Sequence, residues 1–387
     1  MKLVVVGWYG TETIGDRAIL VGILSRISNV KNIEKVTIGA LNPFFTERTI
    51  LEDEKFIKQV TNESVDLSVF NSKSKLEIMH AVSESDFVIM GGGPIMAIPD
   101  LKMVDYTIKL AKSLGKKTGI IGCGFDPLKT KEFINVGASI LENSDIKIFR
   151  DETARKNAIE LMQYLNKPFN GYEYKVALDP AIEAALVYKN SKQKNLIVDR
   201  AEVVINFRDL PEIYNEFDQK AHINSELCKF TVDFCSSQGN KPVRFVPMHY
   251  FRDGNDDRDF INKLNFDLGG IPNLIIQNEV LTLEETFDAF YHSAYCVGMR
   301  FHSVVLMTIL NGNNYVLDYT NPNNGKIIGF LRDIDDSELS FYNSRYVNLH
   351  TLSEAGINFK YSDRKFSPDY DYIEKRLKII DESLKNV

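Results

Sequence analysis

The sequence has few cysteines and a single tryptophan. The four cysteines, Cys123, Cys228, Cys235 and Cys296, are scattered along the chain, and none of them forms a CxxC pair. This spacing excludes a dense disulfide framework and gives no metal-binding pattern. We therefore expect free thiols, no metal and a reducing, cytoplasmic environment.

Long apolar runs are also missing. No segment approaches the roughly 20 consecutive apolar residues that a membrane-spanning helix needs. The N-terminal stretch MKLVVVGWYG reaches its first glycine too early for a secretory signal. We expect a soluble protein whose contact with a membrane is at most peripheral.

The chain lacks an excess of basic residues. Its formal net charge is −7 at pH 7 and its pI is about 5.6. Proteins that hold nucleic acid usually present a broad basic surface to the phosphates. Nucleic acid is therefore not an expected partner, and an anionic ligand must be met by a few well-placed cations.

The order of apolar segments predicts an α/β fold. Short β-rich runs alternate with longer segments of helical period, which is the pattern of parallel sheets. In the first half we predict strands at Leu3–Val6, Lys35–Ile38, Phe87–Met90, Lys117–Ile121 and Ile146–Phe149. In the second half we predict strands at Glu202–Phe207, Val243–Pro247, Asn273–Ile276, Tyr295–Gly298 and Tyr315–Asp318.

A length of 387 residues favours two domains, because a single core seldom grows that large. The stretch Lys189–Asn195 has no apolar residue and is the best boundary. We expect domains at residues 1–190 and 200–365 that face a cleft. Residues 366–387 are expected to form a final helix that packs on a domain, and crossing back over the cleft is one route for it.

Two glycine-rich loops follow predicted strands of the first half. The stretch GWYGTETIGDRAIL contains Gly7, Gly10 and Gly15 before a helix that starts near Asp16, and the second loop contains Gly91–Gly93. Glycine permits close backbone approach, and a helix N-terminus attracts an anion or a hydroxyl group. A tight structural turn explains each loop equally well. The dinucleotide fingerprint GxGxxG is absent, which disfavours a dehydrogenase.

The segment VGMRFHSVVLM places an arginine and a histidine inside an apolar run. Arg300 and His302 follow the strand Tyr295–Gly298, and a short helix is predicted at Ser303–Leu310. An arginine at such a turn binds carboxylate or phosphate in bidentate geometry. The competing interpretation makes His302 an ordinary core histidine, although Arg300 has no acidic neighbour in the sequence.

Three more polar residues stand where strands of the second half end. Arg208 ends the first of these strands, His249 follows the second, and Lys326 follows the last one across the loop YTNPNNGK. Ligands of open α/β sheets bind beyond the carboxyl ends of the strands. The sequence therefore predicts an anion pocket in the second domain.

The ordered motifs resemble the polysaccharide pyruvyltransferase family over most of the chain. These motifs are GWYGTETIGDRAIL, GGGPI at Gly91–Ile95, FRDETA at Phe149–Ala154, LDPA at Leu178–Ala181, VVINFR at Val203–Arg208 and GMRFHSVVLM at Gly298–Met307, followed by Tyr319 and Lys326. Two features depart from the family pattern. The spacing from Tyr319 to Lys326 is long, and Glu12–Ile14 stand where relatives commonly have asparagine.

The resemblance implies two Rossmann-like domains, similar to the GT-B glycosyltransferases. It also implies transfer of pyruvate from phosphoenolpyruvate to two hydroxyls of a sugar, which forms a ketal on a precursor of a surface polysaccharide such as a capsule or exopolysaccharide. The resemblance also implies a sugar acceptor, lipid-linked or not, a cytoplasmic location for which the inner face of the membrane is one option, and no cofactor. Arg300 and His302 would serve the donor and the chemistry. The other expected donor contacts are Arg208, Lys326 and His249, and the expected acceptor contacts are Gly10, Asp16, Gly92 and Gly93.

The chemistry gives His302 a specific task. An imidazolium has a pKa near the working pH, so His302 can protonate the methylene carbon of the donor. The base that activates the sugar hydroxyl is either Asp16 or His249. Two alternative functions stay open, namely a GT-B glycosyltransferase that uses a nucleotide sugar and a non-catalytic carbohydrate- or phosphate-binding module.

Overall fold

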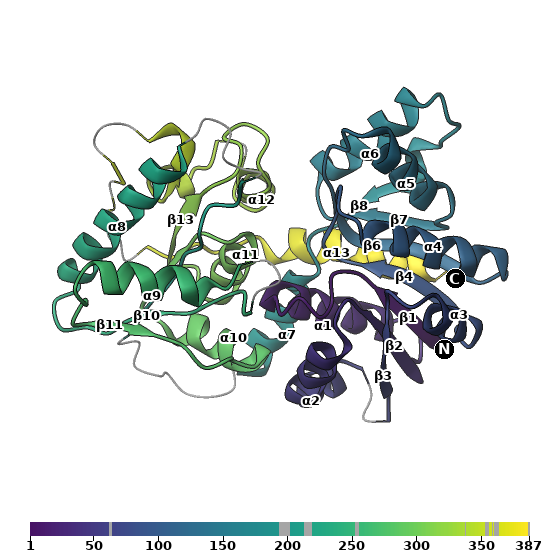
Figure 1. The fold of residues 1–387 in the computed structure, drawn as a ribbon, viewed down its shortest axis with the longest axis horizontal. Helices are drawn as coiled ribbons and strands as arrows, with labels where there is room; N and C mark the ends of the chain where they lie inside the picture. Colours follow the sequence, from purple (N-terminus) through teal and green to yellow (C-terminus); the bar gives the residue numbers. More distant parts are fainter. Residues whose placement is uncertain are drawn as a thin grey trace. The chain divides into compact units, whose positions relative to one another are not determined.

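Strands and helices alternate along the chain and form two compact units. A computed structural model describes residues 1–61, 64–192, 202–212, 219–251, 255–336, 338–352, 356–357, 359 and 364–385. The first unit comprises Met1–Val187 together with Tyr370–Val387, and the second comprises Tyr188–Asp369. In each unit, helices cover both faces of a parallel sheet (Figure 1).

The sheet of the first unit has the order β3-β2-β1-β4-β6-β7-β8, with the short β5 paired to β6. Its strands are β1 (Lys2–Val6), β2 (Lys35–Ala40), β3 (Asp66–Asn71), β4 (Phe87–Gly91), β5 (Pro94–Ile95), β6 (Lys117–Phe125), β7 (Ile146–Phe149) and β8 (Tyr174–Val176). Its helices are α1 (Ile14–Ser28), α2 (Pro43–Val60), α3 (Lys75–Ser83), α4 (Leu101–Ser113), α5 (Lys131–Glu142), α6 (Glu152–Tyr164), α7 (Ala181–Lys192), which runs past the point of division, and α13 (Tyr370–Leu384). The strand order reverses between β1 and β4.

The sheet of the second unit has the order β11-β10-β9-β12-β13-β14, and all its strands are parallel. Its strands are β9 (Val203–Asn206), β10 (Val243–Phe245), β11 (Leu274–Ile276), β12 (Tyr295–Gly298), β13 (Asn314–Asp318) and β14 (Tyr346–Asn348). Its helices are α8 (Lys220–Ser237), α9 (Asp257–Asp267), α10 (Leu283–His292), α11 (Phe301–Leu310) and α12 (Lys326–Ile334). Here the order reverses between β9 and β12, and such a reversal is where open α/β sheets bind ligands.

All ten predicted strands are present, and two of them, β7 and β12, have the predicted bounds. Helix α2 and strand β3 were not predicted. The buried face of α2 includes Thr46, Thr49 and Asp53, so its pattern is only partly apolar. The stretch Lys189–Asn195 is not a simple linker, because α7 continues through Lys192, and residues 193–195 lie outside the described part of the chain.

Helix α13 packs on the first unit against α1 and β8 (Figure 1). Its apolar face is fully buried and consists of Ile373, Leu377, Ile380 and Leu384, as the helical spacing predicts. Beside this face, Arg26 of α1 forms ion pairs with Glu183 at 2.6 Å, Glu374 at 2.6 Å and Asp381 at 3.3 Å. The apolar face and the ion pairs together join the C-terminal helix to a helix near the N-terminus.

Helix α10 begins with a capping box, which the spacing of Thr282 and Glu285 in the sequence predicts. The Thr282 hydroxyl accepts a hydrogen bond from the Glu285 amide at 3.1 Å, and the Glu285 carboxylate accepts one from the Thr282 amide at 2.8 Å. Replacing Thr282 with alanine is expected to lower the free energy of unfolding by about 1 kcal/mol. Chemical denaturation measures this loss. Ser113→Ala is the control, because the Ser113 hydroxyl caps no amide and only donates to the Leu110 carbonyl at 2.8 Å. Equal stability of the two variants would contradict the capping role.

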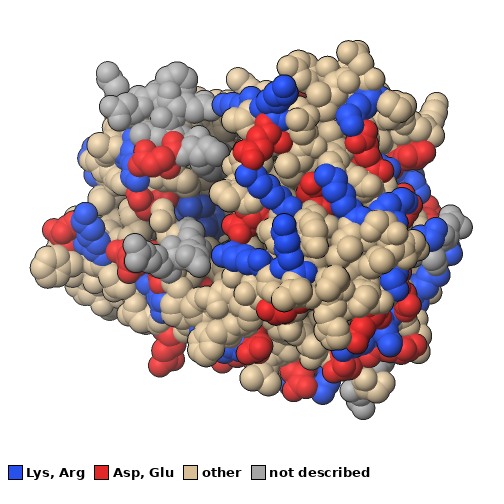
Figure 2. All heavy atoms as spheres, turned by 45° about the vertical axis from the view of Figure 1, so that its right-hand side comes forward, with Lys and Arg blue, Asp and Glu red and all other residues tan. Residues whose placement is uncertain are grey.

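The composition bears on three further features, namely membrane-spanning helices, surface charge and the state of the cysteines. No helix in the described ranges is both long and apolar enough to cross a membrane. Figure 2 shows acidic side chains among the basic ones on the face that it draws, in keeping with a net charge of −7. All four cysteines are free thiols, as the sequence predicts.

Candidate functional site

The cationic candidates of the second unit gather where its strand order reverses. Arg208 follows β9, and Arg300 and His302 follow β12, the strand next to β9. Lys326 is the first residue of α12, beyond the neighbouring strand β13. Because parallel strands end at the same edge of a sheet, these residues occupy one edge although up to 118 positions separate them in the sequence (326 − 208).

Arg300 forms a buried ion pair that the sequence did not reveal. Its Nε lies 2.7 and 2.8 Å from the two carboxylate oxygens of Asp257, and its Nη2 lies 2.6 Å from one of them. The Asp257 carboxylate also accepts hydrogen bonds from the amides of Met248 at 2.9 Å and His249 at 3.2 Å. Asp257 therefore holds the Arg300 side chain and the loop after β10 in one network.

By its sequence alone, the acidic run Asp256–Asp259 is most simply a solvated loop, and this network corrects that interpretation. Asp256 caps α9 by accepting from the Arg258 amide at 2.9 Å, and Asp257, in the first turn, is only 1% exposed. A buried carboxylate requires a charged or hydrogen-bonded partner. The partner lies 43 positions away along the chain, so the acidic run alone could not identify it.

Helix α11 begins two residues earlier than predicted. Arg300 is its N-cap residue and His302 lies in its first turn, so the histidine belongs to the helix and not to the preceding turn. The rings of His302 and Phe301 lie 5.0 Å apart, and the Lys326 ammonium lies 5.7 Å from the Phe301 ring. Phe301 therefore places Lys326 close to the arginine–histidine pair.

Arg208 is a largely buried cation beside other cations. Within the described ranges it forms no ion pair with a carboxylate, and its Nε donates to the Asp209 carbonyl at 3.2 Å. Its guanidinium carbon lies 5.4 Å from the centre of the Tyr319 ring. Burial and the nearby charge of Arg300 lower the pKa of Arg208. Such an environment favours binding of an anion.

Tyr319 is the functional candidate that the sequence-based site assignment omitted. It follows β13 and is 1% exposed. Burial raises the pKa of its phenol, but the charges of Lys326, Arg208 and Arg300 outweigh that effect, so the pKa is lowered overall. The available signals were its place directly after a strand of this edge and its place among the residues that carry the family resemblance.

His249 lies beside the same network. It is 5% exposed, its amide donates to Asp257, and its carbonyl accepts from the Asp257 amide at 3.1 Å. The loop after β10 thus reaches the group formed by Arg208, Arg300, Lys326 and Tyr319. The structure brings all the predicted donor-side residues to one edge of one sheet.

The glycine candidates of the first unit also border a reversal of strand order. Gly10 follows β1, whereas Gly92 and Gly93 follow β4, and all three have positive φ angles of 83°, 73° and 69°. A Cβ atom at Gly92 would lie 2.0 Å from Ile19 Cγ2, and one at Gly93 would lie 2.3 Å from Trp8 Cδ1. Tight packing and positive φ angles are therefore enough to explain why these positions are glycine, without a ligand.

Asp16 lines a small cavity together with Gly10, Glu12 and Thr46. The volume of the cavity is about 20 Å³, which is room for roughly one water molecule. Glu12 has a positive φ of 62°, and its buried carboxylate is bound to Arg48 and accepts from the Thr49 hydroxyl at 3.3 Å. Burial raises the pKa of Glu12, and Arg48 and Arg17 oppose that rise. The unusual Glu12–Ile14 segment is thus held by α2.

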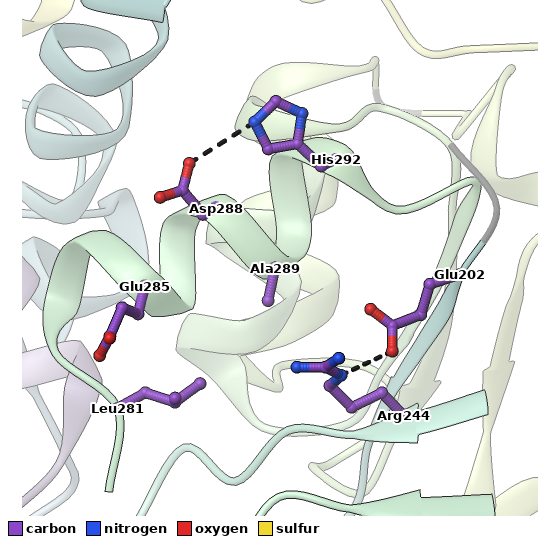
Figure 3. Close-up of a pocket in the computed structure, with 7 residues that line it drawn as sticks. All are labelled: Glu202, Arg244, Leu281, Glu285, Asp288, Ala289 and His292. Atoms are coloured by element: carbon purple, nitrogen blue, oxygen red, sulfur yellow. Dashed lines mark hydrogen bonds and ion pairs between the residues drawn. The ribbon is translucent and has the colours of Figure 1, made fainter. Parts of the chain in front are cut away.

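A larger pocket lies elsewhere on the second unit (Figure 3). It has a volume of about 430 Å³ and is lined by Glu202, Arg244, Leu281, Glu285, Asp288, Ala289 and His292. Arg244 is paired with Glu202 at 2.6 Å, and His292 lies 3.5 Å from Asp288. Glu202 precedes β9, at the opposite strand end from Arg208. Substitutions in this pocket can therefore serve as controls for substitutions at the sheet edge that holds Arg208, Arg300, His302 and Lys326, which we call the cationic edge. In the ranges that the structure describes, no three His, Cys, Asp or Glu side chains are grouped as metal ligands.

Several solved structures resemble the chain in fold. UDP-GlcNAc 2-epimerase from Methanocaldococcus jannaschii, in complex with UDP-GlcNAc and UDP, has a TM-score of 0.55 and 13% identity, and the match covers 100% of this chain and 98% of that chain. UDP-N-acetylglucosamine 2-epimerase from Rickettsia bellii has a TM-score of 0.54 and 11% identity, with 100% and 97% covered. The S. aureus MnaA–UDP structure has a TM-score of 0.52 and 12% identity, with 82% and 79% covered. These likenesses show a fold of the GT-B kind.

Comparison of sequences identifies the family more specifically than comparison of folds. No curated protein matches the chain in sequence. The family model described as polysaccharide pyruvyl transferase matches residues 14–321, which is more than half of the chain. The matched range includes Gly92, Gly93, Arg208, Arg300 and His302, whereas Lys326 lies beyond it. The chain therefore belongs to the polysaccharide pyruvyl transferase family.

Proposed function

We propose that the protein transfers pyruvate from phosphoenolpyruvate to two hydroxyl groups of a sugar and forms a cyclic ketal. The observation that carries this proposal is the convergence of Arg208, Arg300 and Lys326 at the edge where the strand order reverses. Phosphoenolpyruvate carries a carboxylate and a phosphate on three carbons, so its site needs several cations in a small volume. The proposal assigns this task to side chains and needs no cofactor.

The proposed reaction begins with proton transfer to the donor. His302 gives a proton to the methylene carbon, while the first sugar hydroxyl attacks C2 and loses its proton to a base. Asp16 and His249 remain the two candidates for that base. The resulting adduct releases phosphate when its C2–O bond breaks, and the second hydroxyl then closes the ring. One hydroxyl proton ends on the new methyl group and the other on phosphate.

In this proposal Arg300 does not bind the donor through two parallel hydrogen bonds. Its Nε and one Nη already bind Asp257, so this side of the guanidinium is occupied by that carboxylate. Arg300 then contributes its charge and any remaining donor atoms. Arg208 becomes the principal candidate for bidentate contact, since it forms no carboxylate pair in the described chain.

The test of the function is a reaction with defined substrates. The purified protein is incubated with phosphoenolpyruvate and a panel of free, polymeric and lipid-linked sugars, and phosphate release is followed together with the mass gain of a ketal. Coupled appearance of both products with one acceptor is the expected result. Phosphoenolpyruvate binding without turnover on any acceptor would instead favour a non-catalytic binding module.

Transfer from a nucleotide sugar is the second candidate function. It is favoured by the fold, because the similar structures include complexes with UDP and UDP-GlcNAc. The two functions differ in the ligand that stabilises the protein against heat. Stabilisation by phosphoenolpyruvate and not by UDP or GDP is expected, and the reverse pattern would favour glycosyl transfer.

Arg208→Lys is expected to weaken use of the donor. Lysine keeps the charge but cannot form two parallel hydrogen bonds to a carboxylate or phosphate. We expect KM for phosphoenolpyruvate to rise about tenfold, which corresponds to about 1.4 kcal/mol. Arg244→Lys is the matched control, because Arg244 lies in the pocket of Figure 3 and pairs with Glu202. An unchanged KM for Arg208→Lys would remove Arg208 from the donor site.

A further inference from the structure

The hydroxyl of Tyr319 lies where cations from three segments converge. Arg208 comes from the segment after β9, Arg300 from the N-cap of α11, and Lys326 from the start of α12. The guanidinium carbon of Arg208 lies 5.4 Å from the Tyr319 ring centre, and Arg208 donates a hydrogen bond to the phenol oxygen. The phenol is thus in direct contact with one of the proposed donor-binding cations.

The backbone of Tyr319 is fixed as well. The His350 Nε2 atom lies 2.8 Å from the Tyr319 carbonyl oxygen, and the ring is 1% exposed. The next residue, Thr320, is held by the Asp318 carboxylate, which accepts from its amide at 2.7 Å and from its hydroxyl at 2.6 Å. A tyrosine fixed in this way can present its hydroxyl to a bound ligand with little reorganisation.

We propose that Tyr319 is the acid that protonates the phosphate as it leaves the donor. The inference rests on the proposed function, since it requires phosphoenolpyruvate to bind through its phosphate at Arg208 and Lys326. A phosphate held by Arg208 lies within reach of the hydroxyl to which Arg208 donates. Tyr319 thus offers an O–H group next to Arg208, one of the residues proposed to bind the phosphate.

The step balances in atoms and charge. In the adduct formed at C2, the bond between C2 and the phosphate oxygen breaks, and its electron pair stays with that oxygen. The Tyr319 proton moves to the phosphate, and Arg208, Lys326 and Arg300 stabilise the phenolate that remains. The second sugar hydroxyl attacks the cationic C2, and its proton restores the phenol. Tyr319 is therefore regenerated in each cycle.

The charges around Tyr319 suit this role. The charges of Lys326, Arg208 and Arg300 act on the phenol of Tyr319, Asp257 is paired with Arg300, and His350 lies against the Tyr319 carbonyl. Burial raises the pKa of Tyr319, whereas the three cations lower it by more, so the phenol is a stronger acid than an ordinary tyrosine. Only the protonated phenol can act, so kcat/KM should fall as the pH rises through this lowered pKa.

Tyr319→Phe tests the inference, because it removes the hydroxyl and keeps the ring. We expect kcat to fall about 10²-fold and the contribution of Tyr319 to the alkaline limb of the pH profile of kcat/KM to disappear. Tyr315→Phe is the matched control, since Tyr315 lies on β13, is 3% exposed, and packs against Phe359. Unchanged kcat and an unchanged alkaline limb in Tyr319→Phe would overturn the proposal.

Two further measurements keep the test decisive. If Tyr319→Phe does not fold, a fluorotyrosine at position 319 keeps the shape and lowers the phenol pKa. The alkaline limb should then move to lower pH, and a limb that stays in place would overturn the role. If the unaltered protein shows no pyruvyl transfer with any acceptor, the proposed function has failed. If it transfers pyruvate and the variants behave like it, only the role of Tyr319 has failed.

Discussion

His302→Gln is expected to lower the rate of pyruvyl transfer by about 10² to 10⁴-fold, because a positioned proton donor contributes that much. Glutamine keeps a polar side chain in the first turn of α11 but cannot transfer a proton. The rest of the anion site stays intact, so KM for phosphoenolpyruvate should change little. The measurement is steady-state kinetics of phosphate release with the acceptor that the panel identifies.

The control for this prediction is His292→Gln. His292 ends α10, lies in the pocket of Figure 3 and is 3.5 Å from Asp288, remote from the cationic edge. It should leave the rate unchanged. A folded His302→Gln protein that transfers pyruvate at nearly the original rate would show that the proton reaches the methylene carbon from another group.

Asp257→Ala is expected to lower the free energy of unfolding by about 3–5 kcal/mol. The change leaves the buried guanidinium of Arg300 without its partner, and an uncompensated buried charge costs this much. It also leaves the Met248 and His249 amides without the carboxylate that accepts their hydrogen bonds. Chemical denaturation of the full chain, followed by circular dichroism, measures the loss.

Two variants test whether the loss of stability comes from the unpaired charge of Arg300 or from any substitution in the acidic run Asp256–Asp259. Asp259→Ala changes an exposed residue of the same run and should shift stability by no more than about 0.5 kcal/mol. The double variant Asp257→Ala with Arg300→Met removes both charges and should recover part of the stability. No recovery in the double variant would show that the unpaired charge is not the source of the loss.

Much of the fold could be predicted from local sequence. The strands of the first unit at β1, β4 and β7 and the core strands of the second unit are short apolar runs bounded by polar or glycine residues. The capping box of α10 and the apolar face of α13 are likewise local patterns. These features depend on residues within one or two helical turns, so the sequence displays them directly.

Other elements gave no such signal. Helix α2 buries polar residues such as Thr46 and Asp53, and β3 has Phe70 as its one buried position. Asp53 is buried because Arg17 of α1 pairs with it at 2.7 Å. The burial of a polar side chain depends on a partner from another part of the chain, and periodicity cannot supply that partner.

The candidate site also combines features set by local sequence with contacts between distant parts of the chain. The sequence by itself determined that Arg208, His249, Arg300, His302 and Lys326 follow strands of a parallel sheet, because strand and loop are set by local pattern and parallel strands end at one edge. Only the tertiary structure decided what each of them contacts. It paired the Arg300 guanidinium with Asp257, placed His302 in the first turn of a helix and brought Tyr319 near three cations. The reason is physical: charges and hydrogen bonds act over a few ångströms in space, and the strand order brings together residues far apart in the sequence.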